Sequence, residues 1–461
     1  MASVIISDSI DAEIEVDCLI IGGGAAGLTA ALAADEAGET VLVAERDSAL
    51  SGSTALSSGL VPAAGTKAQA AQSIADSQAA FFDDIMAKNK HSADPNHVRT
   101  IVAQAPATID WLAETHGIPF HVLDDFLYPG HSYHRMHAVP EVTGRGLITR
   151  LEQAVAATDV MVVTGARVTD LVMSTKKEVI GAFCERPDGT REAIAASRTI
   201  LACNGYGGNP ELVAKFIPEM KDALYFGHPG NQGEAILWGE KLAAVPSHLS
   251  GYQGHGSVAH PHGILVTWAL MMEGGIQVNL KGERFSNEHQ GYSEQAVSVL
   301  AQPQQTAFNI FDERLCTLGR EFDDFRVAEE TKAVIRAETL SELAEKLGID
   351  HATLSETMQT CDDLAVSGKA DQFGRHFDAD KRLKPPFAAV KVTGALFHTQ
   401  GGLVIDDQAR VIKPDGVVFE NLFACGGAAC GVSGPEVSGY LSGNGLLTAL
   451  SLGHIAGLNA G

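Results

Sequence analysis

A glycine-rich loop near the N-terminus has the residue types and spacing that bind the pyrophosphate of a dinucleotide. Gly22, Gly24 and Gly27 follow one apolar run, and Glu45 ends the next. Glycine at these places permits a tight turn, a close approach of the backbone to the pyrophosphate, and close packing of helix on strand. The following helix directs free N–H groups at the phosphates, and Glu45 can accept from ribose hydroxyls. The spacing predicts a dinucleotide site and leaves FAD and NAD open.

A strand–helix–strand unit is predicted to position this loop, with a buried strand at 15–21, an alanine-rich helix at 28–37 and a strand at 40–44. Further strands are predicted at 161–169, 178–183, 199–203, 403–406 and 422–425, with a closing helix from Gly445. From about 250 to 390, His, Met and charged residues mix with helical stretches such as 329–347. We therefore expect a nucleotide-binding domain of residues 1–248 and 389–461, interrupted by a domain of residues 249–388.

Composition narrows the class of protein. The 461 residues carry a formal net charge of −24, which argues against nucleic acid and against an anionic membrane surface. The seven cysteines are scattered without a CxxC pair, so a disulfide framework is not expected. His260 and His262 lack nearby carboxylates, and no metal site is expected. The sequence has no basic leader and no apolar run that could span a bilayer, which favours the cytoplasm.

Five later stretches are similar to FAD-contacting loops of the fumarate reductase/succinate dehydrogenase flavoprotein superfamily: Ser51–Gly59, Leu201–Asn209, Gly401–Asp406, Leu422–Gly427 and Gly443–Leu447. The resemblance implies an α/β fold, with a Rossmann-like FAD-binding domain of the glutathione-reductase type interrupted by an α+β capping domain. Some members carry a histidine linked to the flavin, but here Ser53 or a neighbour stands there, so FAD is expected to bind non-covalently. The residues expected to bind FAD are Gly22, Gly24, Ala25, Ala26, Gly27, Glu45, Arg46, Gly52, Ser53, Thr54, Ser58, Gly59, Val168, Cys203, Gly205, Gly426, Gly427, Asn444, Leu446 and Leu447.

The same resemblance locates catalytic positions. Fumarate reductases hold a dicarboxylate with two histidines and two arginines, and the histidines correspond to His255 and His398 here. Both arginine positions are occupied by tyrosine, namely Tyr292 and Tyr440. At these two positions the chain therefore lacks the arginines whose guanidinium groups bind a carboxylate in bidentate fashion. Fumarate is for this reason an unfavourable substrate.

Tyrosine at both positions resembles the 3-ketosteroid Δ1-dehydrogenase and cyclic-ketone dehydrogenase branch. That likeness implies that Tyr292 removes a proton beside a ketone, while Tyr440 and the Asn444 N–H hold the ketone oxygen. Stabilisation of the developing enolate acidifies the neighbouring C–H, and the flavin accepts a hydride from the adjacent carbon. Because tyrosine titrates near ~10, the base needs a lowered pKa or a relay, for which His255 or His289 is available. Ketosteroid dehydrogenases also use a third tyrosine, from the FAD-binding domain, and the resemblance makes Tyr133 or Tyr128 the candidate for it here.

Several alternatives remain open. A smaller cyclic keto acid or simple enone fits as well as a steroid, because Arg135 and Arg284 could bind one carboxylate. The chain could instead reduce an enone, or reduce an unsaturated acid with His255, His398 and an unrecognised arginine. A flavin-binding regulator without turnover is a third class. The electron acceptor (a quinone, oxygen or a carrier) and the oligomeric state are not predicted.

Overall fold

The computed structural model describes residues 2–124 and 126–459, and the chain folds into two compact units. The first unit contains Met1–Pro218, Gly227–Tyr252 and His398–Gly461, and the second contains Glu219–Phe226 and Gln253–Phe397. The chain of the first unit is thus interrupted twice by segments of the second.

The first unit is built on a nine-stranded sheet in which the strand before the glycine loop is central. Its path runs β1-β8-β9-β10-β2-β3-β7, and β21 pairs with β10 and with β20. β2 pairs in parallel with β3 and with β10, so the carboxyl ends of these strands share one edge, where ligands bind in open α/β sheets. The strands are β1 (Ser3–Ile6), β2 (Ile14–Ile21), β3 (Val41–Ala44), β7 (Met161–Val163), β8 (Arg167–Met173), β9 (Val179–Glu185), β10 (Arg191–Leu201), β20 (Arg410–Ile412) and β21 (Val418–Ala424).

Helices cover this sheet because its central strands are apolar on both faces, as the wholly buried β3 illustrates. The helices of the unit are α1 (Ala25–Glu36), α2 (Gly52–Ala55), α3 (Lys67–Ala71), α4 (Gln78–Lys88), α5 (Pro95–Glu114), α6 (Gly144–Val155), α7 (Pro210–Phe216), α8 (Glu234–Leu242) and α15 (Asn444–Leu458). Two small sheets complete it, one formed by β4 (Val61–Pro62), β5 (His121–Val122) and β6 (Met136–Ala138), the other by β12 (Pro246–Ser247) and β19 (Gly402–Leu403).

Close packing of α15 on α1 fixes the start of α15 relative to the glycine loop. A Cβ atom at Gly453 would lie 2.4 Å from the Ala26 carbonyl oxygen, and one at Gly457 would lie 2.4 Å from that of Ala30. Only glycine allows the two backbones to approach so closely. Arg198 holds the far end of α15 by donating to the Ala456 carbonyl at 2.7 Å.

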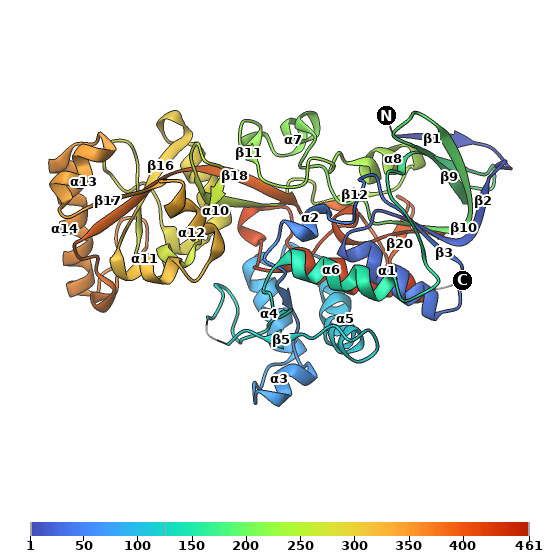
Figure 1. The fold of residues 1–461 in the computed structure, drawn as a ribbon, viewed down its shortest axis with the longest axis horizontal. Coiled ribbons are helices and arrows are strands. Elements are labelled where there is room, and N and C mark those ends of the chain that lie inside the picture. The colour runs from blue at the N-terminus through green and yellow to red at the C-terminus, as the bar shows by residue number, and fades with distance from the viewer. Residues whose placement is uncertain (1, 125, 460–461) are drawn as a thin grey trace. The chain divides into compact units, whose positions relative to one another are not determined.

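The second unit is a seven-stranded sheet with a hydrophobic core on each face. Along β18, Ala388 and Val390 belong to one core while Phe387 and Ala389 belong to the other, as the period-two geometry of a strand requires. Figure 1 shows α13 and α14 beside β17 in this unit. Its elements are β11 (Leu224–Tyr225), β13 (Tyr252–Ala259), β14 (Ile264–Leu265), α9 (Ala269–Met272), β15 (Ile276–Val278), α10 (Tyr292–Leu300), β16 (Thr306–Asp312), α11 (Glu313–Gly319), α12 (Asp323–Glu330), β17 (Val334–Ala337), α13 (Leu340–Leu347), α14 (His351–Ser367) and β18 (Phe387–Thr399).

The single helix predicted at 329–347 is wrong. Helix α12 ends at Glu330, Lys332 takes a left-handed φ of 61°, and β17 then pairs antiparallel with β18. Val334 and Ile335 are β-branched and suit a strand, and Thr339 caps α13 by accepting from the Glu342 N–H. The strand predicted at 161–169 is likewise two strands, β7 and β8.

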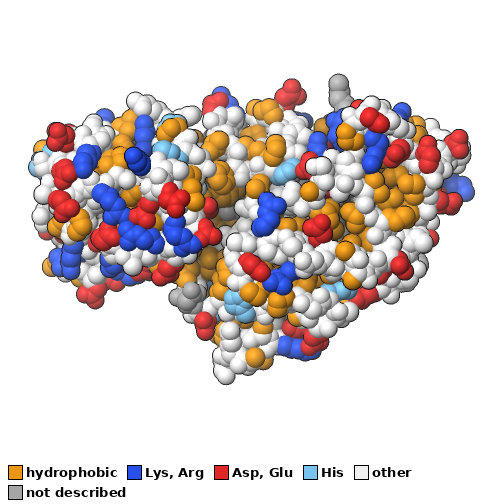
Figure 2. Space-filling view, viewed as in Figure 1, with side chains coloured by type: hydrophobic (Ala, Val, Ile, Leu, Met, Phe, Trp, Pro, Cys, Tyr) orange, Lys and Arg blue, Asp and Glu red, His pale blue; other side chains and the backbone are white. Residues whose placement is uncertain are grey.

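Charged side chains of both signs lie interspersed on the surface of the second unit (Figure 2). Arg320 and Arg336 share Glu313 and Glu329 in a network that joins α11, α12 and β17. Such exposed pairs contribute little individually, so the two apolar cores supply most of the stability of this unit. Among the described residues, no helix is long and apolar enough to cross a membrane.

Candidate active site

The glycine loop has the geometry of a pyrophosphate cradle. A Cβ atom at Gly27 would lie 1.9 Å from the Gly22 carbonyl oxygen, and one at Gly22, where φ is 113°, would lie 2.5 Å from the Ala202 carbonyl oxygen. Gly24 is the N-cap of α1 and brings no side chain across the helix end, where Ala25 and Ala26 form the first turn. The positive end of the helix dipole is therefore open to a phosphate.

Glu45 follows β3 and supports the loop directly. Its Oε2 accepts from the Gly23 N–H at 2.7 Å and its Oε1 from the Asp47 N–H at 2.9 Å, and the residue is buried. Arg46 forms an ion pair with Glu234 at 3.2 Å. Glu45 thus has a structural role besides the ribose contact predicted for it.

The Ser53 hydroxyl connects α2 to two later segments of the first unit, of which one is the predicted FAD loop Leu201–Asn209. Ser53, in α2, accepts from Asn204 Nδ2 at 2.9 Å and from Asn231 Nδ2 at 2.8 Å. Thr54 accepts from the Ala25 N–H at 3.0 Å and so ties α2 to α1. Asn231 was not predicted, because it lies far from every glycine motif in the sequence and only the fold brings it to Ser53.

The other residues predicted to bind FAD lie in the same unit. Gly205, Gly59 and Gly427 are positions where a Cβ atom would come within 2.5 Å of Thr399, Thr143 and Asn204 respectively. Burial raises the pKa of the Cys203 thiol to about 12, so it stays protonated. The remaining members occupy α2 and the loop after it (Gly52, Ser58), the buried face of β8 (Val168), the turn after β21 (Gly426) and the first turn of α15 (Leu446, Leu447).

Three predicted catalytic residues lie around the start of α15: Asn444 is its first residue, Tyr440 precedes it, and His398 lies at the end of β18. The His398 ring contacts the Tyr440 ring edge-on, with centroids 5.5 Å apart, and a Cβ atom at Gly445 would lie 3.2 Å from His398 Nε2. Asn444 is fully buried, and among the described residues its Oδ1 has no hydrogen-bond partner. A buried, unsatisfied carbonyl beside a glycine-capped helix end fits a bound flavin, which would supply a donor. The Asn444 N–H, predicted to hold the substrate, donates to the Leu441 carbonyl at 3.1 Å.

The second unit holds two more of the predicted catalytic residues, His255 and Tyr292. His255, on β13, stacks on Tyr292 at the start of α10 with centroids 4.9 Å apart. The stack continues through Phe397 at 5.4 Å and on to Phe226, which lies 4.9 Å from Phe397. Burial lowers the pKa of His255 to about 3, and its Nδ1 accepts from the Ser257 N–H at 3.2 Å. His255 is therefore a neutral imidazole with its proton on Nε2.

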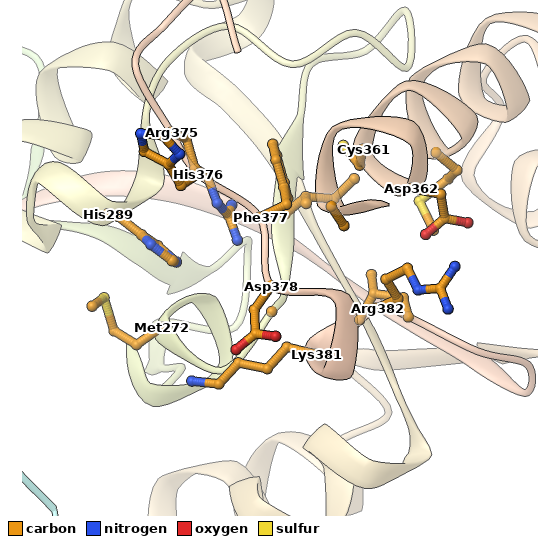
Figure 3. Close-up of a pocket in the computed structure, with 15 residues that line it drawn as sticks. Met272, His289, Cys361, Asp362, Arg375, His376, Phe377, Asp378, Lys381 and Arg382 are labelled. Atoms are coloured by element: carbon orange, nitrogen blue, oxygen red, sulfur yellow. The ribbon is translucent and has the colours of Figure 1, made fainter. Parts of the chain in front are cut away.

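His289, the other candidate partner for Tyr292, lines a pocket of the second unit. Its Nε2 lies 3.0 Å from the Met271 carbonyl oxygen. The pocket, of about 230 Å³, is lined by His289, Arg375, His376, Phe377 and neighbours, and neither Tyr292 nor His255 is among its lining residues (Figure 3). His255, one of the two histidines proposed to assist Tyr292, stacks on its ring.

Both arginines considered as carboxylate ligands are engaged in buried ion pairs. Arg284 pairs with Glu288 at 2.5 Å and with Asp371. Arg135 pairs with Asp76 at 3.0 Å and with Asp84 at 2.9 Å, and its side chain is fully buried.

The His131–His137 cluster contributes to the closing loop through a histidine. His131 Nε2 lies 3.0 Å from the Ser442 carbonyl oxygen, and burial lowers the pKa of His131 to about 4. Tyr133 is 39% exposed, while Tyr128 is partly buried. The cluster thus contacts the Tyr440–Asn444 segment by way of His131.

Comparisons with known proteins give a family match and several relatives in sequence. A family model described as FAD binding domain matches residues 17–446. A probable fumarate reductase of Shewanella frigidimarina is 29% identical over 446 residues, which are 96% of this chain and 74% of the relative. Further relatives at 27% identity are also named fumarate reductases. The 4-oxocyclohexanecarboxylate 2-dehydrogenase of Sinomonas cyclohexanicum is 25% identical over 547 residues, covering 96% of this chain and 92% of that protein.

A solved structure is similar over the whole length. The 3-ketosteroid-Δ4-(5α)-dehydrogenase from Rhodococcus jostii RHA1, in complex with 4-androstene-3,17-dione, has a TM-score of 0.78 at 23% identity and covers 100% of this chain and 99% of that chain. At this identity the likeness shows the fold alone. The family match and this likeness confirm the predicted α/β class with an FAD-binding fold.

Proposed function

Because this chain belongs to the FAD binding domain family, within the fumarate reductase/succinate dehydrogenase flavoprotein superfamily, we propose that it desaturates a cyclic ketone next to the carbonyl group. It binds FAD and is an oxidoreductase acting on carbon–carbon bonds.

The observation that carries the proposal is the engagement of Arg135 and Arg284. A dicarboxylate needs guanidinium groups that are available to the substrate. Each of these arginines is instead neutralised by two carboxylates of its own unit. Breaking such a buried pair to bind a substrate would cost about 3–5 kcal/mol.

The aromatic stack Phe226–Phe397–His255–Tyr292 gives a second line of support. Tyr292, Phe397 and Phe226 are each partly exposed, so the stack offers a partly exposed and largely apolar surface. An alicyclic ring would bury apolar area on such a face, whereas a small dicarboxylate would not. The relative that dehydrogenates 4-oxocyclohexanecarboxylate suggests the size of ring to test.

In the proposed reaction, the Tyr440 hydroxyl donates to the ketone oxygen and stabilises the enolate that develops there. Tyr292 takes the proton from the α-carbon, and the electron pair of that C–H bond forms the new carbon–carbon double bond. Bound FAD supplies the two-electron acceptor for the hydride that leaves the β-carbon. His255, a neutral imidazole stacked on Tyr292, holds the phenol ring in place without adding a positive charge beside it.

Substitution of the two tyrosines tests these roles. We expect Tyr292→Phe to lower kcat on the best ketone by about 10²–10⁴-fold, the range for loss of a general base. We expect Tyr440→Phe to lower it by about 10²-fold, as loss of one donor to a developing oxyanion does. Tyr225→Phe, on β11, is the matched control. Full turnover by both Tyr292→Phe and Tyr440→Phe would refute the assignment.

A second candidate is the reduction of an unsaturated carboxylic acid, which the names of the fumarate reductase relatives favour. It would use His255 and His398 with an arginine other than the two described above. Reoxidation of the reduced flavin by fumarate, but by no enone, would support it.

A further inference from the structure

A line of buried polar side chains connects the first residue of α15 to His398. Asn444 Nδ2 donates to Ser433 Oγ at 2.9 Å, Ser433 Oγ donates to Gln400 Oε1 at 2.6 Å, and Gln400 Nε2 lies 3.0 Å from His398 Nδ1. Asn444, Ser433 and Gln400 are all at most 6% exposed. Water therefore does not compete for these hydrogen bonds, and each donor has to match an acceptor.

The donor and acceptor atoms of these four side chains fix the direction in which hydrogen bonds are donated along the line. An amide nitrogen can only donate, so Ser433 Oγ accepts from Asn444 and its own proton goes to Gln400. Gln400 Oε1 can only accept, so the Gln400 NH₂ group faces His398. His398 Nδ1 must then accept, which leaves the imidazole proton on Nε2.

The opposite direction would require both amides to be flipped. The Asn444 NH₂ group would then occupy the place of Oδ1, and a buried NH₂ group with two donors would replace one buried carbonyl without a partner. His398 Nδ1 would donate to Gln400 and towards the Thr399 carbonyl, which lies at 3.4 Å. The 3.0 Å contact with Gln400 is the shorter of the two, and the orientation that leaves fewer buried donors unsatisfied is favoured.

We infer that Gln400 and Ser433 are positioning residues, which hold His398 as the neutral tautomer with an Nε2–H donor at the start of α15. Gly445 leaves room for the ring there, because a Cβ atom at this residue would lie 3.0 Å from His398 Cε1. Burial lowers the pKa of His398 to about 4, so the imidazole stays neutral near pH 7. Which group accepts from this N–H rests on the proposed function: since His398 contacts Tyr440, the acceptor that we propose is the ketone oxygen held by Tyr440.

Histidine nitrogen NMR on the FAD-loaded protein tests the tautomer without any substrate. Comparison of the wild type with His398→Gln assigns the His398 signals among those of the 17 histidines. We expect an Nε2 that carries hydrogen and an Nδ1 that does not, unchanged from pH 5 to pH 8. A proton on Nδ1, or an imidazolium near pH 7, would overturn the inference.

Gln400→Glu replaces the NH₂ donor that faces His398 Nδ1 with a carboxylate oxygen, which accepts. The size of the side chain and the oxygen that accepts from Ser433 are kept. A carboxylate at this position draws a proton onto Nδ1 and raises the pKa of His398 towards neutrality. We expect a new ionisation in the pH profile of kcat/KM and an Nδ1–H signal by NMR. Gln408→Glu, an exposed residue of the same unit, adds the same charge and should change neither.

Gln400→Met removes the donor without adding charge. We expect kcat on the best ketone to fall about tenfold, as loss of one hydrogen bond allows, with little change in KM and with full FAD content. An unchanged kcat together with an unchanged NMR tautomer in this variant would contradict a positioning role. If no ketone is turned over at all, the proposed function fails, while the NMR spectra still decide the direction of the line.

Discussion

Glu288→Gln is expected to destabilise the second unit strongly, because Glu288 is shared by two buried arginines. It accepts from Arg284 at 2.5 and 3.0 Å, pairs with Arg375 at 2.9 Å, and accepts from the Gln277 N–H at 2.9 Å. The cluster contains two positive charges, on Arg284 and Arg375, and two negative charges, on Glu288 and Asp371. The glutamine variant therefore leaves a net positive charge in the interior. Removing one partner of a buried pair costs about 3–5 kcal/mol.

The pKa of Glu288 gives an independent value, of similar size, for the free energy by which these ion pairs stabilise the folded state. Burial alone would raise it, but Arg375 and Arg284 lower it from 4.5 to about 2. At ~1.4 kcal/mol for each pH unit, this difference stabilises the folded state by about 3 kcal/mol. Because the folded pKa is the lower one, this stability is present above pH 4.5 and is lost as the pH falls towards 2.

Urea denaturation at several pH values measures this effect. Trp268 is the tryptophan of the second unit, so its fluorescence in a Trp111→Phe/Trp238→Phe background reports on that unit alone. We expect Glu288→Gln to lower the free energy of unfolding by about 3–5 kcal/mol at pH 7, and by less as the pH falls below 4.5. Glu283→Gln, at an exposed position nearby, should change it by less than about 0.5 kcal/mol. A loss below about 1 kcal/mol at pH 7, or one that does not depend on pH, would refute the reasoning.

Three further predictions concern the first unit and the buried histidines. Gly27→Ala should abolish FAD binding, because its Cβ atom would lie 1.9 Å from the Gly22 carbonyl oxygen; the ratio of flavin to protein absorbance checks this, with Ala37→Ser at the exposed end of α1 as the control. Gly445→Ala should keep its FAD but lower kcat about tenfold, because the added methyl group contacts the His398 ring at 3.0 Å; unchanged kinetics would show that the ring position does not matter. Stability should fall as the pH drops from 6.5 towards 4, because burial lowers the folded pKa values of His131, His137, His398 and His454 to about 4 and that of His255 to about 3. Unfolding free energies that stay flat across this pH range would contradict those pKa values.

Local sequence patterns predicted the dinucleotide-binding unit well. The apolar runs and glycines of β2, α1 and β3 are contiguous, and each residue's role depends on near neighbours. The helix predicted at 329–347 was wrong because its alanines, glutamates and leucines favour a helix locally, whereas pairing with β18 selects a strand at Val334–Ala337. Tertiary pairing overrode local propensity there.

The parts of the site that escaped prediction depend on contacts between residues distant in sequence. Asn231 and Ser53 are 178 positions apart and form a hydrogen bond, and Arg284 and Asp371, which form an ion pair, are 87 positions apart. No motif marks Ser433 or Gln400, because each acts only through its neighbours in the folded chain. The resemblance supplied Tyr292, Tyr440 and the two histidines, and their predicted roles on a substrate stay predictions.

The proposal that this flavoprotein oxidises a cyclic ketone is tested most directly by anaerobic rapid mixing of the oxidised, FAD-loaded protein with ketones. The panel contains cyclohexanone, 4-oxocyclohexanecarboxylate and a 3-ketosteroid, and flavin absorbance is followed in the wild type and in Tyr292→Phe. We predict that at least one ketone bleaches the flavin of the wild type, and that Tyr292→Phe slows this by about 10²-fold or more. A flavin that no ketone reduces, but that fumarate reoxidises once it has been reduced chemically, would contradict the proposal.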